Sequence, residues 1–255
     1  MTPHSTLSTF YLMTKLILMI CPHDTAQNPE RWYFLTQYLS QQLGMHVEFE
    51  QSLQFSEFHE RMADADLVYA NPQDSLELRH QHHFIPLVRP ANLYDEVVFV
   101  ASESVNQPTL AMLAGQRIAT VTNMLLTKVA LQLLHQQAIH PGELINKDSW
   151  LAVVNSLIKG ETDFAFVYQD TYNSLSATSR EMLQPFYRST QQVAFHNLQL
   201  NPRQSQHKSQ LEQLLLLMNS TPKGVEVLER LSISQWLSVT ETELAVIKNL
   251  IEQYT

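Results

Sequence analysis

The chain has 255 residues, a net charge of −9, 44% hydrophobic residues and 16% charged residues. This composition is typical of a globular protein, and the acidic balance without a long basic run argues against nucleic acid as a partner. There are only five glycines and no GxGxxG or GxxxxGKS/T motif, so neither a Rossmann nor a P-loop nucleotide site is expected. The single cysteine, Cys21, rules out an intrachain disulfide and a cysteine-based zinc cluster.

The N-terminal region contains no convincing targeting or membrane segment. The first apolar run, Leu16–Cys21, is too short for a signal-peptide core or a membrane span. The preceding residues, Met1–Thr14, include no cationic region and are expected to form a loose tail. We therefore expect no membrane insertion and, for the sequence as it stands, a cytoplasmic location. A true start further upstream would make the protein periplasmic.

Strand-like apolar runs and helical periods alternate along the chain. The expected strands are Leu16–Cys21, His46–Glu50, Asp66–Ala70, Phe84–Arg89, Glu96–Ala101, Arg117–Val121, Asp163–Val167, Gln184–Arg188 and Gln192–His196. The expected helices are Pro29–Leu43, Phe55–Met62, Pro72–His80, Leu110–Ala114, Leu125–Gln137, Trp150–Ile158, Ser205–Asn219, Pro222–Leu231 and Thr240–Gln253. This alternation predicts an α/β fold whose mostly parallel sheets are flanked by helices.

The central stretch is a buried strand, a polar turn and an amphipathic helix, in the order Arg117–Val121, TNM and Leu125–Gln137. A helix that begins at such a turn leaves backbone N–H groups without partners at the positive end of its dipole, which suits an anion. The plainer interpretation is an ordinary connection with Thr122 or Asn123 as the N-cap. Lys128, one turn into the helix, either reaches such an anion or faces solvent.

Other side chains are weaker candidates for chemistry. The HQHH segment, with His80, His82 and His83, has no carboxylate or thiolate at ligand spacing and is interpreted as a solvated loop rather than a metal site. His23 and Asp24 are adjacent, and adjacent side chains on an extended chain point apart. We expect Cys21 to be a buried small hydrophobe, and we expect no catalytic residue, cofactor or metal.

Six motifs occur in the order found in one known family. They are RWYFLTQYLSQQLG at Arg31–Gly44, DLVYANP at Asp66–Pro72, YDEVVFV at Tyr94–Val100, LAGQRIA at Leu113–Ala119, GETDFA at Gly160–Ala165 and TPKGVEVLERL at Thr221–Leu231. Over most of its length the chain therefore resembles the phosphate/phosphite/phosphonate-binding proteins of ABC transporters, the PhnD-like type II periplasmic binding proteins.

The anion-binding motif departs from the family pattern. In the family, a Ser-Thr-Ser-Gly turn holds the phosphonate oxygens, whereas TNMLLTK here keeps Thr122, Asn123 and Thr127 around three bulky apolar residues. The family's Ser-His pair corresponds to Ser149 and Trp150, and Tyr168 stands where a carboxylate often pairs with a ligand amine. The resemblance thus implies a more aromatic and less charged pocket.

The resemblance implies a two-lobed fold in which each lobe is a mostly parallel sheet flanked by helices, with crossing hinge strands between the lobes. Lobe 1 is expected at residues 15–97 plus 194–255, and lobe 2, which carries the anion turn, at residues 98–193. A small solute would bind in the cleft between the lobes and favour a closed form by hinge motion. The expected ligand-binding residues are Tyr69, Asn71, Tyr94, Thr122, Asn123, Thr127, Trp150 and Tyr168.

The expected function is that of a solute-binding protein for a small oxyanion or another small solute, acting as a transport receptor or a ligand sensor. An ABC permease would be the partner if the protein is exported. The first alternative is a cytoplasmic regulatory or interaction protein that kept the fold, changed or lost the ligand, and works with a cytoplasmic partner. The second alternative is an enzyme built on the same fold.

Overall fold

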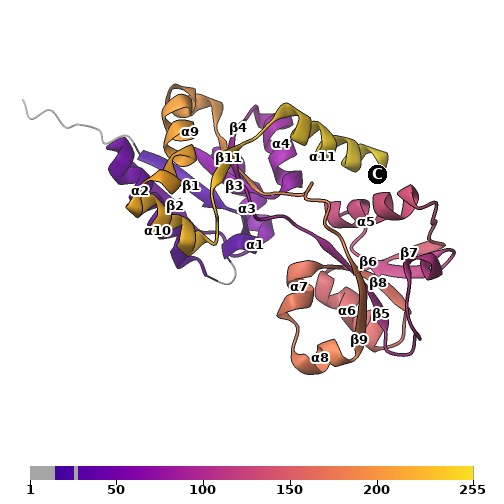
Figure 1. The fold of residues 1–255 in the computed structure, drawn as a ribbon. Coiled ribbons are helices and arrows are strands. Elements are labelled where there is room, and N and C mark those ends of the chain that lie inside the picture. The colour runs from indigo at the N-terminus through magenta and orange to yellow at the C-terminus, as the bar shows by residue number, and fades with distance from the viewer. Residues whose placement is uncertain (1–14, 26–27, 255) are drawn as a thin grey trace, which may run out of the picture. The chain divides into compact units, whose positions relative to one another are not determined.

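The structure is a computed structural model that describes residues 15–25 and 28–254. The expected loose tail, Met1–Thr14, lies outside the described residues. The chain divides into two compact units (Figure 1), and each is described by itself. Of the described residues, unit 1 comprises 15–25, 28–70, 77–91 and 197–238, and unit 2 comprises 71–76, 92–196 and 239–254. The expected lobe boundaries differ from these units at residues 71–76, 92–97, 194–196 and 239–254, which were expected in lobe 1 and group with unit 2.

Unit 1 is built on a mixed sheet in which the described strands follow the order β11-β4-β10-β3-β1-β2. Its strands are β1 (Lys15–Ile20), β2 (His46–Glu50), β3 (Leu67–Ala70), β4 (Ile85–Pro90), β10 (Asn197–Leu200) and β11 (Trp236–Ser238). Strands β1, β2 and β3 are parallel, while β10 runs antiparallel between β3 and β4. A strand from late in the sequence therefore completes the middle of this sheet.

Helices cover both faces of the unit 1 sheet. They are α1 (Pro22–Thr25), α2 (Glu30–Leu43), α3 (Phe55–Arg61), α9 (Lys208–Leu216), α10 (Pro222–Leu231) and, from residue 77 onwards, α4 (Pro72–His82), with 3-10 turns at Met62–Asp64, Pro202–His207 and Met218–Ser220. On one face, Phe58 and Leu78 from α3 and α4 pack against Met19 and Val68. Helix α2 ends at Gly44, which adopts the left-handed conformation that glycine tolerates best (φ 65°).

Unit 2 has a second mixed sheet, whose described strands follow the order β7-β6-β8-β5-β9. Its strands are β5 (Val97–Ser102), β6 (Arg117–Thr120), β7 (Glu143–Asn146), β8 (Phe164–Tyr168) and β9 (Leu183–Arg188). Its helices are α5 (Leu125–Gln136), α6 (Trp150–Ile158), α7 (Gln169–Ser174), α8 (Ala177–Glu181) and α11 (Glu241–Gln253), with a 3-10 turn at Leu110–Leu113. Strands β6, β7 and β8 are parallel, and β5 is antiparallel to β8 and β9.

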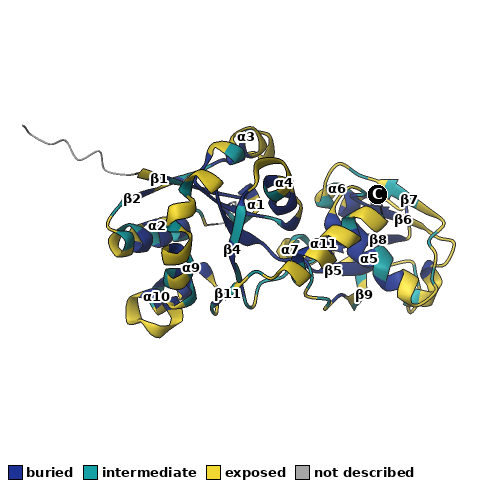
Figure 2. Ribbon diagram, turned by 90° about the horizontal axis from the view of Figure 1, so that it is seen from above, coloured by how far each residue is buried: buried dark blue, intermediate teal, exposed yellow. Residues whose placement is uncertain are grey.

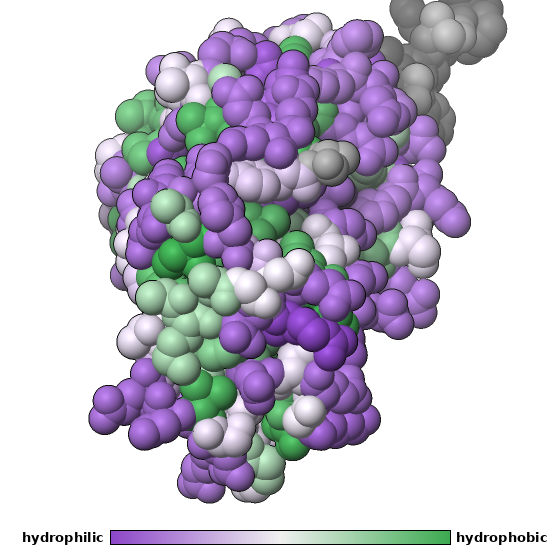
Figure 3. All heavy atoms as spheres, turned by 90° about the vertical axis from the view of Figure 1, so that its right-hand side faces the viewer, coloured by the Kyte–Doolittle hydropathy of each residue, from purple (hydrophilic) through white to green (hydrophobic). Residues whose placement is uncertain are grey.

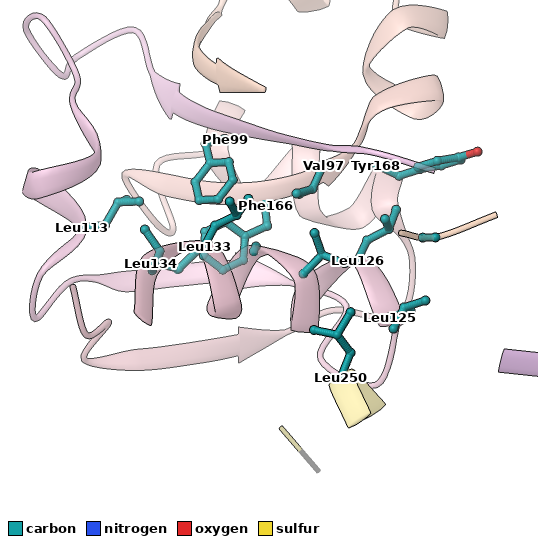
Figure 4. Packing of buried hydrophobic residues seen from close by; sticks show 14 of the residues in the cluster. Val97, Phe99, Leu113, Leu125, Leu126, Leu133, Leu134, Phe166, Tyr168 and Leu250 are labelled. Atoms are coloured by element: carbon teal, nitrogen blue, oxygen red, sulfur yellow. The ribbon is translucent and has the colours of Figure 1, made fainter. Parts of the chain in front are cut away.

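Each face of the unit 2 sheet has its own hydrophobic cluster. On one face, α5 packs on Phe99 and Phe166, and Leu250 of the C-terminal helix α11 belongs to the same cluster (Figure 4). On the other face, Val153 and Leu157 of α6 pack on alternate residues of the same strands. The inner strands β5, β6 and β8 are thus largely buried while the helices expose one side (Figure 2), as expected for a sheet enclosed between layers.

The predicted α/β class is confirmed, and most predicted elements lie within a residue or two of the observed ones. Sequence reasoning missed α1, α7, α8, β7 and β11. The strand predicted at Gln192–His196 is wrong, because only Ala194 makes an isolated bridge, to Asp95, and the regular strand β10 follows at Asn197–Leu200.

No helix among residues 15–25 and 28–254 is long and apolar enough to cross a membrane. The face drawn in Figure 3 is mostly hydrophilic, with smaller apolar areas between.

Candidate functional site

Three parallel strands of unit 2 end at the same edge of its sheet, and helices begin there. Strand β6 leads into Thr122 and Asn123, β7 ends at Asn146, and β8 ends at Tyr168. Helices α5, α6 and α7 start just after these three strands. In α/β sheets the carboxyl ends of parallel strands are the usual place for a ligand. This edge is therefore the candidate site.

The turn between β6 and α5 is closed by a residue from β7. Asn146 Oδ1 accepts two hydrogen bonds from Thr122, one from its backbone N–H (3.0 Å) and one from its hydroxyl (2.8 Å). The predicted N-cap at Thr122 or Asn123 is wrong, because Met124 occupies that position and makes no side-chain capping bond. The physical reason is that Asn146, distant in sequence, engages the Thr122 hydroxyl. Asn123 is exposed.

The first turn of α5 leaves backbone donors open. The N–H of Met124 donates to Val121 O (3.1 Å), and the N–H of Thr127 donates to Met124 O (3.1 Å). Among the described residues, no group accepts a hydrogen bond from the N–H of Asn123, Leu125 or Leu126. Free N–H groups at the positive end of a twelve-residue helix can hold an anion.

Thr127 lies beneath the turn rather than on its surface. Its side chain is fully buried, its hydroxyl donates to Val121 O (2.7 Å), and it lies 2.7 Å from the hydroxyl of Thr120. Because the single proton of Thr127 goes to the carbonyl, Thr120 must be the donor in the second bond. Thr127 therefore fixes the end of β6 to the start of α5.

Lys128 takes neither of the two places considered for it. Its side chain is buried, and its Nζ donates to the backbone carbonyls of Ile251 (3.3 Å) and Tyr254 (3.2 Å) at the end of α11. A cation at the C-terminal end of a helix satisfies carbonyls that have no partner within the helix. Burial lowers the pKa of Lys128 below its usual value. The lysine thus attaches α11 to α5 instead of reaching an anion or facing solvent.

The start of α6 supplies an aromatic wall. Ser149 is the N-cap, as predicted, because its side chain accepts a hydrogen bond from the N–H of Ala152 (3.2 Å). The next residue, Trp150, is half-buried, and its ring centroid lies 6.5 Å from that of Tyr168. Two of the predicted aromatic site residues are therefore neighbours at this edge.

Tyr168 belongs to a polar cluster that sequence reasoning did not find. Its ring is buried in the hydrophobic cluster while its hydroxyl points away from the other labelled side chains (Figure 4). That hydroxyl lies 2.9 Å from Asp95 Oδ1 and 3.1 Å from Asp170 Oδ2. The other oxygen of Asp95 lies 3.2 Å from His196 Nε2. Asp95 and His196 come from segments about a hundred residues apart, so no local pattern could have joined them.

The remaining predicted site residues have structural partners of their own. Tyr94, which precedes Asp95, is half-buried against the hydrophobic cluster of unit 2. Asn71 also groups with unit 2 and caps α4, because its Oδ1 accepts from the N–H groups of Gln73 (2.9 Å) and Asp74 (3.0 Å). Tyr69 groups with unit 1, where it is only 1% exposed and packs 4.9 Å from Trp32. Contact of these residues with a ligand stays a prediction.

The other sequence candidates are accounted for differently. Cys21 is fully buried in the core of unit 1, in agreement with its interpretation as a small hydrophobe. The interpretation of HQHH as a loop is wrong in part, because His80 and His82 lie in the last turn of α4. His83 follows the helix with positive φ (58°), and all three imidazoles are exposed.

The fold is that of the type II periplasmic binding proteins. The chain belongs to the family of ABC transporter phosphonate periplasmic substrate-binding proteins, which matches residues 18–244. No curated protein matches the sequence. The predicted family is therefore confirmed. Its members are substrate-binding proteins for small ligands and not enzymes.

Solved structures support the same fold at low sequence identity. XAC2383 from Xanthomonas citri, bound to chloride ion, is 15% identical with a TM-score of 0.69, and the match covers 94% of this chain and 98% of that one. PhnD1 from Prochlorococcus marinus, in complex with methylphosphonate, is 14% identical with a TM-score of 0.69 over 94% and 97% of the two chains. The aliphatic sulphonate binding protein SsuA from Escherichia coli is 10% identical with a TM-score of 0.69 over 94% and 91%.

Proposed function

We propose that the protein binds a small oxyanion at the start of α5, with Asn123 at the contact, Thr122 holding the turn, and Trp150 and Tyr168 as its aromatic wall. The proposal rests on the free backbone N–H groups of Asn123, Leu125 and Leu126 at the N-terminus of α5. Hydrogen bonds from such groups to a charged oxygen contribute about 1.5–3 kcal/mol each, and the helix dipole adds to them. The relatives that bind methylphosphonate and aliphatic sulphonate support this ligand class.

The bonding of the turn changes the roles expected of its side chains. The Thr122 hydroxyl donates its proton to Asn146, so towards a ligand it acts mainly by holding the turn in place. Thr127 is buried beneath the turn and supports it from inside. The anion is held chiefly by the backbone, which explains how the site tolerates Met124, Leu125 and Leu126 where the family has small hydroxyl residues.

A binding screen tests the ligand class. The purified chain is titrated calorimetrically with phosphate, phosphite, methylphosphonate, 2-aminoethylphosphonate, sulfate and methanesulfonate. We expect saturable binding of at least one of them and a thermal shift on saturation, because a ligand that binds only the folded state stabilises it. Absence of binding to all six would contradict the proposal.

Leu125→Pro tests the role of the backbone directly. Leu125 is the first residue of α5, where proline fits, and the preceding Met124 already has the extended conformation that proline requires (φ −83°, ψ 144°). The change removes one free N–H, while the control Leu125→Ala shortens the same side chain and keeps that donor. We expect Leu125→Pro to bind the oxyanion about tenfold or more weakly than Leu125→Ala. Equal affinities of the two variants would show that the N–H of Leu125 does not contact the ligand.

We further propose that the protein works as the receptor of an ABC transporter in the periplasm, with a permease as its partner. The family of the chain supports this assignment. Fractionation of cells that express the complete gene tests it, since the mature chain should be found in the periplasmic fraction. Recovery of the chain only from the cytoplasm would favour a sensor or regulatory protein.

A further inference from the structure

We infer that Asn146 is a ligand-binding residue of the proposed oxyanion site. The inference rests on the proposed function and deepens it, because it names a donor that comes from a third segment of the chain.

The hydrogen-bonding partner of Asn146 fixes which end of its amide faces the turn. Oxygen and nitrogen of an asparagine amide are assigned from their partners, and a backbone N–H can only donate. The atom that lies 3.0 Å from the N of Thr122 must therefore be the oxygen. The Thr122 hydroxyl is free to rotate and donates to the same oxygen at 2.8 Å.

The nitrogen of the same amide is then placed beside the turn. Amide geometry puts Nδ2 about 2.2 Å from Oδ1, and hence within about 5 Å of the backbone N of Thr122. Asn146 is exposed, and none of the described residues accepts a hydrogen bond from its Nδ2. Two amide donors are thus available at the edge of the turn that leads into α5.

Strand pairing holds Asn146 in this position. Thr120 of β6 pairs with Asn146 of β7, and the N–H of the next residue, Lys147, donates to Thr120 O (2.9 Å). The amide is therefore carried by the last residue of a strand and not by a loop. A donor on a rigid element can be preorganised for a ligand.

The two lysines nearest to the turn in sequence do not compete for the role. Lys147 Nζ forms an ion pair with Glu161 Oε2 (2.7 Å), and this lysine lowers the pKa of Glu161. Lys128 donates to the end of α11. An anion at the turn therefore depends on neutral donors, and the side-chain amide of Asn146 adds two of them to the backbone set.

Asn146→Asp separates positioning of the turn from contact with the ligand. The carboxylate keeps an oxygen that accepts from Thr122, so the turn and the melting temperature should be preserved. It replaces the amide donors with a second negatively charged oxygen next to the ligand. We expect the affinity for methylphosphonate or inorganic phosphate, whichever the wild type binds, to fall about 10- to 100-fold. The matched control Asn155→Asp makes the same charge change at an exposed position of α6 and should leave the affinity unchanged.

The outcomes distinguish this inference from the function on which it rests. If the wild type binds one of the two probes and Asn146→Asp binds it equally well, Asn146 makes no contact and the inference is overturned while the proposed function stands. If the wild type binds neither probe, the inference is overturned, whereas the proposed function is overturned only when none of the six oxyanions binds. Should the variant fail to fold, spectra of the ¹⁵N-asparagine-labelled wild type decide. The Asn146 side-chain signals should shift on saturation, and unchanged signals overturn the inference.

Discussion

The buried hydroxyl pair of Thr120 and Thr127 gives a prediction that can be worked out bond by bond. Thr127→Val keeps the shape of the side chain but removes its hydroxyl. Val121 O loses that donor and keeps the N–H of Met124 (3.1 Å). The Thr120 hydroxyl, fully buried, loses its acceptor. One orphaned buried hydroxyl costs about 1–3 kcal/mol of unfolding free energy.

The partner substitution should cost less. In Thr120→Val the hydroxyl of Thr127 still donates to Val121 O, so no buried donor is orphaned and only one net hydrogen bond is lost, about 0.5–1.5 kcal/mol. In the double variant there is no Thr120 hydroxyl left to be orphaned. We therefore expect the double variant to be more stable than the sum of the single changes predicts, which is a favourable coupling in a double-mutant cycle.

Urea unfolding of the four proteins measures this coupling. Each kcal/mol corresponds to roughly 2–4 °C in melting temperature for a chain of this size, which gives an independent thermal check. The affinity of Thr127→Val for an oxyanion should stay close to that of the wild type, because the residue supports the turn from inside. Additive single changes would refute the hydrogen-bond assignment. A large loss of affinity with unchanged stability would instead make Thr127 a direct ligand contact.

Three further predictions concern α11, Lys128 and α6. Leu250→Ala should lower the unfolding free energy by about 2–5 kcal/mol, because Leu250 is buried against α5, while Glu252→Ala on the exposed side should change the urea midpoint little. Burial lowers the pKa of Lys128, so the wild type should gain stability as the pH rises from that lowered pKa to about 10.4, the value in the unfolded chain. Lys128→Met should remove this gain, which urea midpoints measured across the range would show. If the variant and the wild type have the same pH dependence, Lys128 is solvated. Ser149→Ala should cost about 0.5–2 kcal/mol through loss of the cap, and Ser149→Thr should restore most of it; equal melting temperatures for all three would show that the cap is not formed.

The sequence allowed prediction of the long, strongly patterned elements. The apolar stripe of α5, the proline start of α10 and the cap at Ser149 are local signals, and each element lies where its signal placed it. Strand β7 was missed because its four residues, ELIN, follow Pro141 and Gly142 and contain only two apolar side chains. Strand β10 was placed too early because its buried Asn197 and Gln199 read as polar.

The candidate site was less predictable, for a different reason. The family motif located the turn at Thr122, but the residue that bonds to Thr122 lies on β7, a strand that had not been recognised. The hydroxyl of Tyr168 has two carboxylate partners. Asp95 precedes it by 73 residues, and Asp170 follows it by two. Hydrogen bonds between residues that are distant in sequence decide which hydroxyl groups have partners within the protein and which can face a ligand.

Each unit is made of segments that are separated in the sequence, and this has a consequence for folding. Strand β10, which lies between β3 and β4 in the unit 1 sheet, is made only after nearly all of unit 2 has been made. The cluster of unit 2 in turn includes Ile247 and Leu250 from the last helix. A nascent chain that has been synthesised only through residue 196 therefore exposes unpaired edges of β3 and β4. Such non-local strand pairing is slow to form, so we expect the unit 1 sheet to be completed late in folding.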